Sequence, residues 1–313
     1  MLVAGPNLTL DRTLNLDELR PGEVLRFDDA VVTPGGKGVN VARTALGLGA
    51  PATLVGFTPG RTGAAAAALL GDEGVALVPV PVRGEIRSTA VVLERSGRVT
   101  VMNEPGPSLG AGDWERFEAA VADRLGAVGV LACSGSLPPG SPGDAYARLA
   151  VLAEGAGAVA IVDVTGAQLG AALEVGAGVV TPNLAEAEGL LHGRADETVE
   201  AGDPLEVRDR ARAAARELVA RGARRAIVTA AAAGAAVADG SSVGWLEAPR
   251  VAQVRNPVGA GDSLVGGLGI ALERGEPFGA AAVFGVAVAA ASVETETAGT
   301  VDAARASGLA GLS

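Results

Sequence analysis

The sequence predicts an α/β protein in which a mainly parallel sheet is flanked by helices and a small antiparallel sheet forms a lid. Short β-branched runs alternate with longer helical patterns, an order typical of a parallel sheet covered by helices. Two regions, about 11–33 and 83–103, contain strand-like runs with little helix between them, which predicts the lid. The 313 residues, 49% of them hydrophobic, are enough for a large core, and we expect a single domain over 1–313.

The individual elements follow from the apolar runs and their flanks. Buried strands are expected at 52–57, 128–135, 158–164, 178–183 and 225–230. Helices are expected at 39–48, 113–125, 143–156 and 205–221, and an exposed connection at 192–206. Ligands of such sheets bind beyond the carboxyl ends of the strands, so the loops after these runs should carry the functional site.

The composition excludes several classes of partner. A net charge of −11 argues against a broad basic surface for nucleic acid. The apolar run at 280–293 is shorter than the roughly 18 residues of a membrane span, so no membrane partner is expected. The one cysteine, Cys133, has no partner for an internal disulfide, and no basic leader precedes a long apolar run, so we expect a cytoplasmic protein. The single histidine argues against a histidine-based triad and a zinc cluster.

The stretch NPVGAGDS (256–263) places small residues and an aspartate directly before an apolar helical pattern. Gly259 and Gly261 permit backbone conformations that are closed to other residues. The amides of Gly259, Ala260 and Gly261 are therefore expected to point outward from a helix N-terminus, an anion-binding arrangement. Asp262 stands at the same place, either as a base beside the anion or as an ordinary capping residue.

A second glycine-rich turn, Gly35-Gly36-Lys37-Gly38, opens the helix expected from residue 39. Its backbone amides, Lys37 and Asn40 are candidates for holding a polar or phosphorylated ligand. The turn is not a Walker A loop, because Lys37 is followed by glycine rather than serine or threonine.

Asn183 and Glu186 lie where the strand expected at 178–183 meets a helix. Asparagine as the cap and glutamate at the third helical position resemble a capping box. Amide and carboxylate oxygens, together with water, also suit a magnesium ion, so the sequence leaves both interpretations open.

Further polar residues stand at expected strand ends. Asn7 and Asp11 follow the first apolar run in GPNLTLD, where the aspartate is suited to accept hydrogen bonds from two sugar hydroxyls. As an alternative, both are turn residues. Ser134 belongs to the loop CSGSLPPG (133–140), at the end of another strand.

Together these motifs resemble the ribokinase-like (PfkB) family of carbohydrate kinases over nearly the whole chain. GGKGVNVA is similar to the first signature of the family and NPVGAGDSLVGG to the second. GPNLTLD, NEPGP (103–107) and SGSLPPG are most similar to the branch that acts on sugar phosphates, which includes 1-phosphofructokinase, tagatose-6-phosphate kinase and the minor type of 6-phosphofructokinase. The resemblance implies a ribokinase-like fold, ATP-dependent phosphorylation of a hexose phosphate with ATP and Mg²⁺, and a homodimer formed through the lid.

The resemblance also implies roles for single residues. Asp262 would be the base that takes the proton from the attacking hydroxyl, with Gly259, Ala260 and Gly261 as the anion hole. Arg87 would hold the substrate's own phosphate, with Arg26 as a weaker candidate. The other implied substrate-binding residues are Asn7, Asp11, Gly35, Gly36, Lys37, Asn40, Asn103 and Ser134. The nucleotide would contact Asn183, Thr229, Gly234, Gly259 and Gly261, and Asn183 and Glu186 would hold Mg²⁺ through water.

Two departures from the family pattern fall on the nucleotide side. Thr181 stands where many relatives have a lysine near the nucleotide phosphates. Ala231 replaces the first glycine of the loop at 229–234, a costly change if this position requires a positive φ.

Three functions remain open at this point. The first is a hexose-phosphate kinase, with fructose 1-phosphate as the leading substrate and tagatose 6-phosphate and fructose 6-phosphate behind it. The second is a kinase for an unphosphorylated sugar or a nucleoside. The third is a catalytically weak sugar-phosphate sensor.

Overall fold

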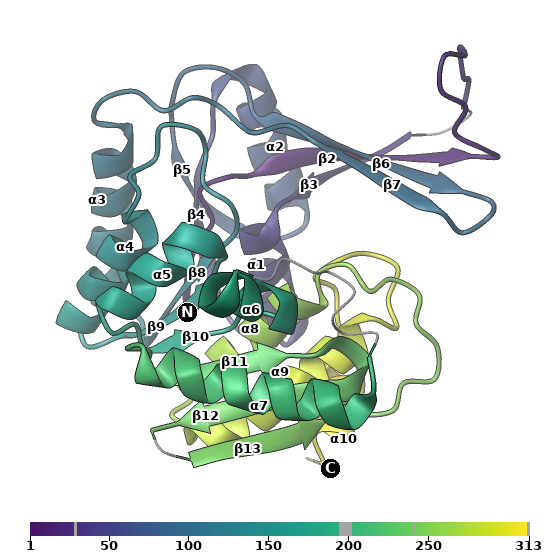
Figure 1. Cartoon of the computed structure of the whole chain (residues 1–313). Helices are drawn as coiled ribbons and strands as arrows, with labels where there is room; N and C mark the ends of the chain where they lie inside the picture. Colours follow the sequence, from purple (N-terminus) through teal and green to yellow (C-terminus); the bar gives the residue numbers. More distant parts are fainter. Residues whose placement is uncertain (28–29, 194–201, 241, 312–313) are drawn as a thin grey trace.

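A nine-stranded sheet forms the centre of the molecule (Figure 1). The computed structural model of the chain describes residues 1–27, 30–193, 202–240 and 242–311. The strands of this sheet are β1 (Leu2–Ala4), β4 (Thr53–Phe57), β5 (Ala76–Val80), β8 (Val130–Ser134), β9 (Val159–Asp163), β10 (Val179–Val180), β11 (Arg225–Thr229), β12 (Gly234–Asp239) and β13 (Ser242–Glu247). Their order is β13-β12-β11-β10-β9-β8-β1-β4-β5, and only β12 and β13 run antiparallel to their neighbours. The expected mainly parallel sheet is confirmed.

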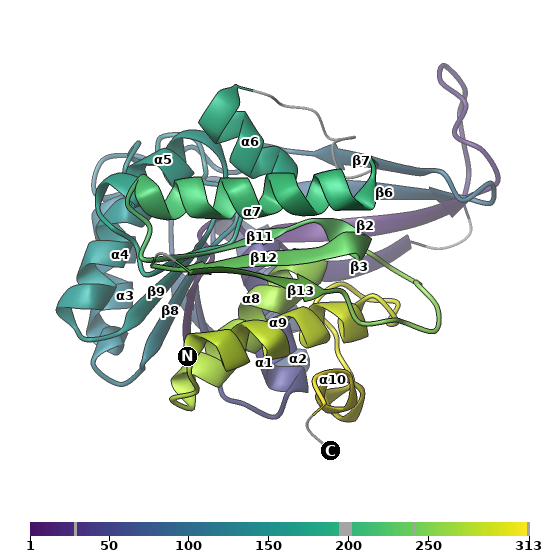
Figure 2. The same cartoon turned by 60° about the horizontal axis from the view of Figure 1, so that its bottom comes forward.

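Helices cover both faces of this sheet (Figure 2). One face carries α3 (Asp113–Leu125), α4 (Ala145–Gly155), α5 (Gly166–Glu174), α6 (Leu184–His192) and α7 (Pro204–Ala220). The other face carries α1 (Lys37–Gly47), α2 (Gly60–Asp72), α8 (Ala260–Glu273), α9 (Phe278–Ser292) and α10 (Ala303–Leu309). In α7, Val207, Ala211, Ala214 and Leu218 recur at helical spacing and are buried, whereas the rest of the helix is largely polar.

The apolar run near 280–293 belongs to α9, which is buried along most of its length. None of the described helices is long and apolar enough to cross a membrane. The connection expected at 192–206 includes residues 194–201, which lie outside the described residues.

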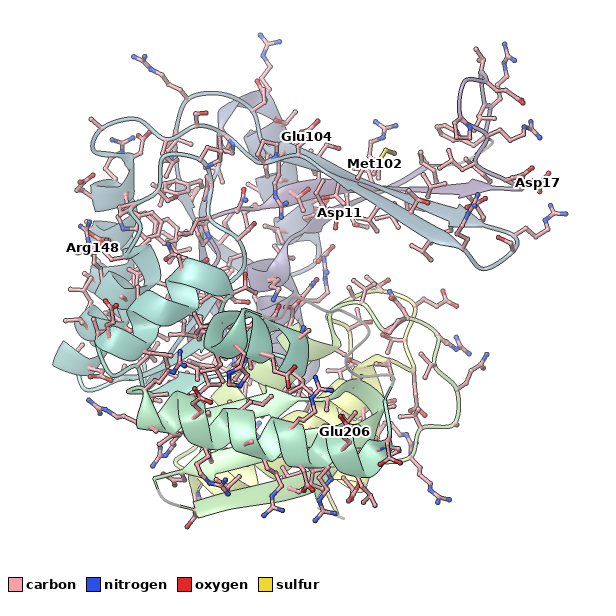
Figure 3. The ribbon with its side chains drawn as sticks, viewed as in Figure 1. Asp11, Asp17, Met102, Glu104, Arg148 and Glu206 are labelled. Atoms are coloured by element: carbon pink, nitrogen blue, oxygen red, sulfur yellow. The ribbon has the colours of Figure 1, made fainter. Side chains whose placement is uncertain are left out.

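A four-stranded sheet, the lid, projects from the main sheet (Figure 1). Its strands, in the order β3-β2-β6-β7, are β2 (Thr9–Leu16), β3 (Ala30–Gly35), β6 (Arg87–Glu94) and β7 (Val99–Asn103). The outer pairs, β2–β3 and β6–β7, are antiparallel as expected, whereas the central pair β2–β6 is parallel. This pairing follows from the connections, because β2 and β6 leave the carboxyl ends of β1 and β5 at the same edge of the main sheet. Asp11 lies at the base of the lid and Asp17 at its tip (Figure 3).

Candidate active site

Asp262 is a buried carboxylate in the first turn of α8. Gly259 caps this helix with a φ of 82°, a left-handed conformation that suits glycine and lets the helix begin abruptly. Asp262 is only 5% exposed. Burial and the nearby charge of Asp163 raise its pKa to about 7, against the opposing effects of Lys37 and of a hydrogen bond from Asn40. A carboxylate that titrates near neutral pH is well matched to general-base chemistry.

The backbone before Asp262 presents N–H groups at the start of the helix. Ala260 N–H donates to Pro257 O at 3.4 Å, a long hydrogen bond. In the described part of the chain, the N–H groups of Gly259 and Gly261 have no hydrogen-bond partner. Because the N-terminus of a helix also carries positive potential, this turn is able to bind an anion directly beside Asp262.

Asn40 connects the glycine-rich turn that opens α1 to the glycine-rich turn that opens α8. Its Nδ2 donates to Asp262 Oδ2 at 2.7 Å. The amide is oriented by Arg43, whose Nη1 donates to Asn40 Oδ1 at 3.3 Å and to Ala298 O at 2.9 Å. Because Asn40 Oδ1 accepts from Arg43, its NH₂ group must face Asp262.

A polar cavity of about 230 Å³ lies beneath the lid. Its lining includes Asn7, Gly36, Lys37, Arg87, Asn103 and Ser134. Asn7 Nδ2 donates to Pro105 O at 3.2 Å and to Ser136 Oγ at 3.0 Å. Asn7 Oδ1 is buried and has no partner among the described residues, so it is an acceptor available to a ligand.

Asp11 lies on β2 beside the turn that opens α1. A Cβ at Gly35 would lie 2.0 Å from Asp11 Oδ2, so only glycine fits at that position. Asp11 Oδ1 is buried without a partner in the described residues. Burial raises the pKa of Asp11, whereas the nearby hydroxyls of Thr9 and Thr89 and the charge of Arg87 oppose the rise.

Arg87 is the first residue of β6, and its positive charge interacts with the carboxylate of Asp11. Its Nε donates to Asn7 O at 3.3 Å, which holds the guanidinium at the cavity wall. Burial lowers the pKa of Arg87 and Asp11 opposes that effect. Arg26, the weaker candidate, is exposed between β2 and β3 and is not part of the cavity lining.

Asn183 and Glu186 form a capping box at the start of α6, as the first of the two interpretations states. Asn183 Oδ1 accepts from Glu186 N at 2.8 Å and Glu186 Oε2 accepts from Asn183 N at 2.9 Å. Burial raises the pKa of Glu186, and Lys37 opposes the rise. A half-buried carboxylate at this position fits a Mg²⁺ ion held through water. No group of three or more histidine, cysteine, aspartate or glutamate side chains that could hold a metal ion occurs within the described ranges.

The loop after β11 carries the expected strain. Thr229 ends β11 and forms a parallel bridge with Asn183, and Gly234 begins β12. Ala231, between them, has a φ of 44° and is the only non-glycine residue with a positive φ in the described chain. Alanine at this position therefore has the unfavourable left-handed backbone conformation that the sequence predicts to be costly.

Two site residues were missed from the sequence. Ser136 lines the cavity and accepts from Asn7, although it stands in the same CSGSLPPG loop as Ser134. Asp163 ends β9 and is 4% exposed, and it accepts hydrogen bonds from Lys37 and Ser134. The available signal was an aspartate directly after the apolar run AVAIV, at the carboxyl end of a parallel strand. The other candidates, Asn40, Lys37, Asn103 and Asp262 among them, lie at or beside this edge of the main sheet.

A buried carboxylate at a helix N-terminus, beside a cavity lined by several polar side chains, is an arrangement that suits an enzyme acting on a polar ligand. Comparison with known proteins makes the class specific, since a match to the pfkB family carbohydrate kinases spans residues 7–304. The chain belongs to this family.

The relatives share nearly the whole length of the chain. It is 32% identical over 287 residues to the ATP-dependent 6-phosphofructokinase isozyme 2 of Escherichia coli (strain K12), covering 91% of this chain and 89% of the relative. It is 36% identical to the 1-phosphofructokinase of Haloferax volcanii, over 88% and 85% of the two chains. Among solved structures, phosphofructokinase-2 from Escherichia coli in complex with fructose-6-phosphate superposes with a TM-score of 0.86 at 29% identity, covering 99% of this chain and 98% of that one.

Proposed function

We propose that this protein uses ATP to phosphorylate a hexose phosphate, with fructose 1-phosphate as the best candidate and fructose 1,6-bisphosphate as its product. One observation carries the proposal. The buried carboxylate of Asp262, at the unpaired amides that begin α8, is hydrogen-bonded through Asn40 to the helix whose first turn lines the sugar cavity.

The chemistry follows from these groups. Asp262 accepts the proton of the attacking sugar hydroxyl, whose oxygen bonds to the γ-phosphorus of ATP while the bond to the ADP oxygen breaks. General-base assistance of this kind contributes about 10²–10⁴ in rate. The amides of Gly259 and Gly261, with Ala260 between them, stabilise the charge on the transferring phosphoryl group.

Recognition of the sugar rests on the acceptors and cations around the cavity. Asn7 Oδ1 and Asp11 Oδ1 are buried acceptors that lack partners in the described residues, and sugar hydroxyls are suitable donors for both. Arg87 and Lys37 place two cations at the cavity, which suits a substrate that already carries a phosphate. Asn103, Ser134, Gly35 and Gly36 complete the substrate side.

The nucleotide side is formed by Thr229, Gly234 and Asn183, which meet where β11 and α6 approach each other. Asn183 and Glu186 would hold Mg²⁺ through water, and the ion would supply positive charge to the nucleotide phosphates.

The choice of sugar phosphate rests on the relatives, which include both a 1-phosphofructokinase and ATP-dependent 6-phosphofructokinases. Fructose 6-phosphate is therefore a strong alternative, and tagatose 6-phosphate follows it. The strained Ala231 favours, as a second candidate, a sensor that binds the sugar phosphate but transfers little phosphate.

The lid supports a homodimer. Val31, Val99 and Val101 of its outer strands lie on one face of the lid and are each about half exposed, at 54%, 53% and 49%. Apolar side chains gathered on a projecting sheet suit burial against a second copy of the chain.

The single cysteine, Cys133, is buried and free, which suits a reducing compartment such as the cytoplasm.

A coupled ADP-release assay tests the proposal. ATP and Mg²⁺ would be supplied with fructose 1-phosphate, fructose 6-phosphate, tagatose 6-phosphate, ribose or adenosine. Turnover on one phosphorylated hexose well above turnover on ribose and adenosine is the expected result. Turnover on ribose or adenosine alone would move the protein to the second class of kinase, and tight sugar-phosphate binding without any turnover would favour the sensor.

A further inference from the structure

Asp163 is a buried carboxylate where several elements meet, and so far only its effect on the pKa of Asp262 has been described. It ends β9, and its Oδ2 accepts from Lys37 Nζ at 3.2 Å and from Ser134 Oγ at 3.2 Å. Its Oδ1 accepts from Thr181 Oγ1 at 3.3 Å. Three of the four residues stand at the carboxyl ends of β8, β9 and β10, and Lys37 is the first residue of α1.

The pair formed by Asp163 and Lys37 is asymmetric. The Asp163 side chain is 6% exposed, whereas the Lys37 side chain is 42% exposed and faces the sugar cavity. A free lysine side chain carries about 2 kcal/mol of rotamer entropy, so an ammonium group without an anchor samples many positions. A rigid, buried anion on one side restricts the ammonium group while its other side stays open to a ligand.

The hydroxyl groups of Ser134 and Thr181 donate to the carboxylate of Asp163 without changing its charge. Ser134 and Thr181 satisfy the carboxylate oxygens without adding charge, so the negative charge of Asp163 remains available to Lys37. The attraction of Asp163 raises the pKa of Lys37, which keeps the ammonium group charged.

We propose that Asp163 is a positioning residue for phosphoryl transfer, whose carboxylate fixes the Lys37 ammonium group at the wall of the sugar cavity. This role rests on the proposed kinase function. Asp163 touches neither substrate nor the transferred group. Its charge also raises the pKa of Asp262, so the variants are compared at about pH 9, where Asp262 is ionised with or without that charge and the effect through Lys37 is isolated.

A double-mutant cycle on the full chain tests this role, with kcat/KM for the preferred sugar phosphate as the readout. Asp163→Asn keeps a group of the same shape and removes the charge, and we expect a loss of about 10- to 100-fold, typical of a hydrogen bond to a charged group. Lys37→Met should lose at least as much. The double variant should be no worse than Lys37→Met alone, because Asp163 has nothing left to position.

Matched variants separate positioning from stability. Asp113, at the start of α3, is another buried aspartate that forms an ion pair, in this case with Arg116. Asp113→Asn removes its charge and should keep the wild-type kcat/KM. Asp163→Glu restores the charge and should recover part of the loss. If Asp163→Asn does not fold, the double variant still provides the comparison with Lys37→Met, because it leaves no lone charge from this pair.

Two results would overturn the role: multiplicative losses in the double variant, or wild-type kcat/KM in Asp163→Asn. Both are measured in an enzyme whose wild type turns over. Failure of the wild type on every sugar phosphate is a different outcome, which refutes the proposed function and this role with it.

Discussion

Asn40 Nδ2 lies 2.7 Å from Asp262 Oδ2, although the two residues belong to glycine-rich turns at opposite ends of the sequence. This hydrogen bond connects α1, whose first residues line the cavity beneath the lid, to α8, which carries the proposed base. It also lowers the pKa of Asp262 against the larger rise caused by burial. Asn40 therefore holds the direction of the carboxylate and is one of several groups that determine its pKa.

Replacing Asn40 with leucine should shift the pH dependence of catalysis. Without the hydrogen bond, the pKa of Asp262 rises further above about 7, so the acidic limb of the kcat/KM profile should move to higher pH. The limb is measured between about pH 5 and 9. Asn15→Leu, at an exposed asparagine on β2 of the lid, is the control and should leave the limb in place. An unmoved limb in Asn40→Leu would separate this residue from the titration of the base.

Replacing Asp262 with asparagine should increase stability although it lowers kcat. The folded-state pKa of about 7 exceeds the ordinary value of 3.8, so the folded protein holds a proton that the unfolded chain has released. The free energy of unfolding contributed by this group therefore falls as the pH rises from about 4 to about 7, and the full cost remains above that range. Asparagine does not ionise, so Asp262→Asn should have a higher Tm than the wild type, by several degrees more at pH 8 than at pH 5. An equal difference in Tm at both pH values would show that burial does not raise the pKa of Asp262.

Replacing Arg87 with alanine should weaken binding of the substrate's own phosphate. A charge-assisted hydrogen bond contributes roughly 1.5–3 kcal/mol, so KM for the sugar phosphate should rise about 10- to 100-fold with a smaller change in kcat. KM for ATP should stay near the wild-type value. Arg124→Ala, on the outer helix α3, is the control. No rise in KM for the sugar phosphate would point to an unphosphorylated substrate.

Replacing Ala231 with glycine should relieve strain on the nucleotide side. The left-handed conformation costs alanine about 1–2 kcal/mol, and the greater freedom of glycine in the unfolded chain takes back about 0.5–1 kcal/mol. We expect a net gain in stability of up to about 1.5 kcal/mol and an unchanged or lower KM for ATP. Ala232→Gly, at a neighbouring residue without a positive φ, should destabilise the protein by about 0.5–1 kcal/mol. Equal losses in both variants would contradict the strain.

Much of the fold was predictable because its signals are local. The apolar runs at β4, β8, β9 and β11 are short, β-branched and buried on both faces, and the helices between them keep helical spacing. The parallel pairing of β2 with β6 was not predictable from those runs. It depends on where β1 and β5 lie in the sheet, and a strand's own residues do not encode that order.

Some residues of the candidate site were likewise predictable from local motifs, and others were not. Asp262, Lys37 and Asn40 stand in contiguous glycine-rich motifs, which made them visible in the sequence. Asp163 and Arg43 are single residues on a strand and a helix, and their importance comes only from the partners that the fold brings to them. Asn183 and Glu186 form a capping box, a structural role that neither requires nor excludes a part in metal binding.

The most direct test of the central claim compares phosphoryl transfer in Asp262→Asn with that in the wild type. The preferred sugar phosphate and saturating ATP with Mg²⁺ would be supplied to both, and binding of the sugar phosphate would be measured separately. If Asp262 is the base, kcat should fall by about 10²–10⁴ while the sugar phosphate still binds with near wild-type affinity. A variant that retains kcat within about threefold of the wild type would contradict the assignment of Asp262 and the mechanism built on it.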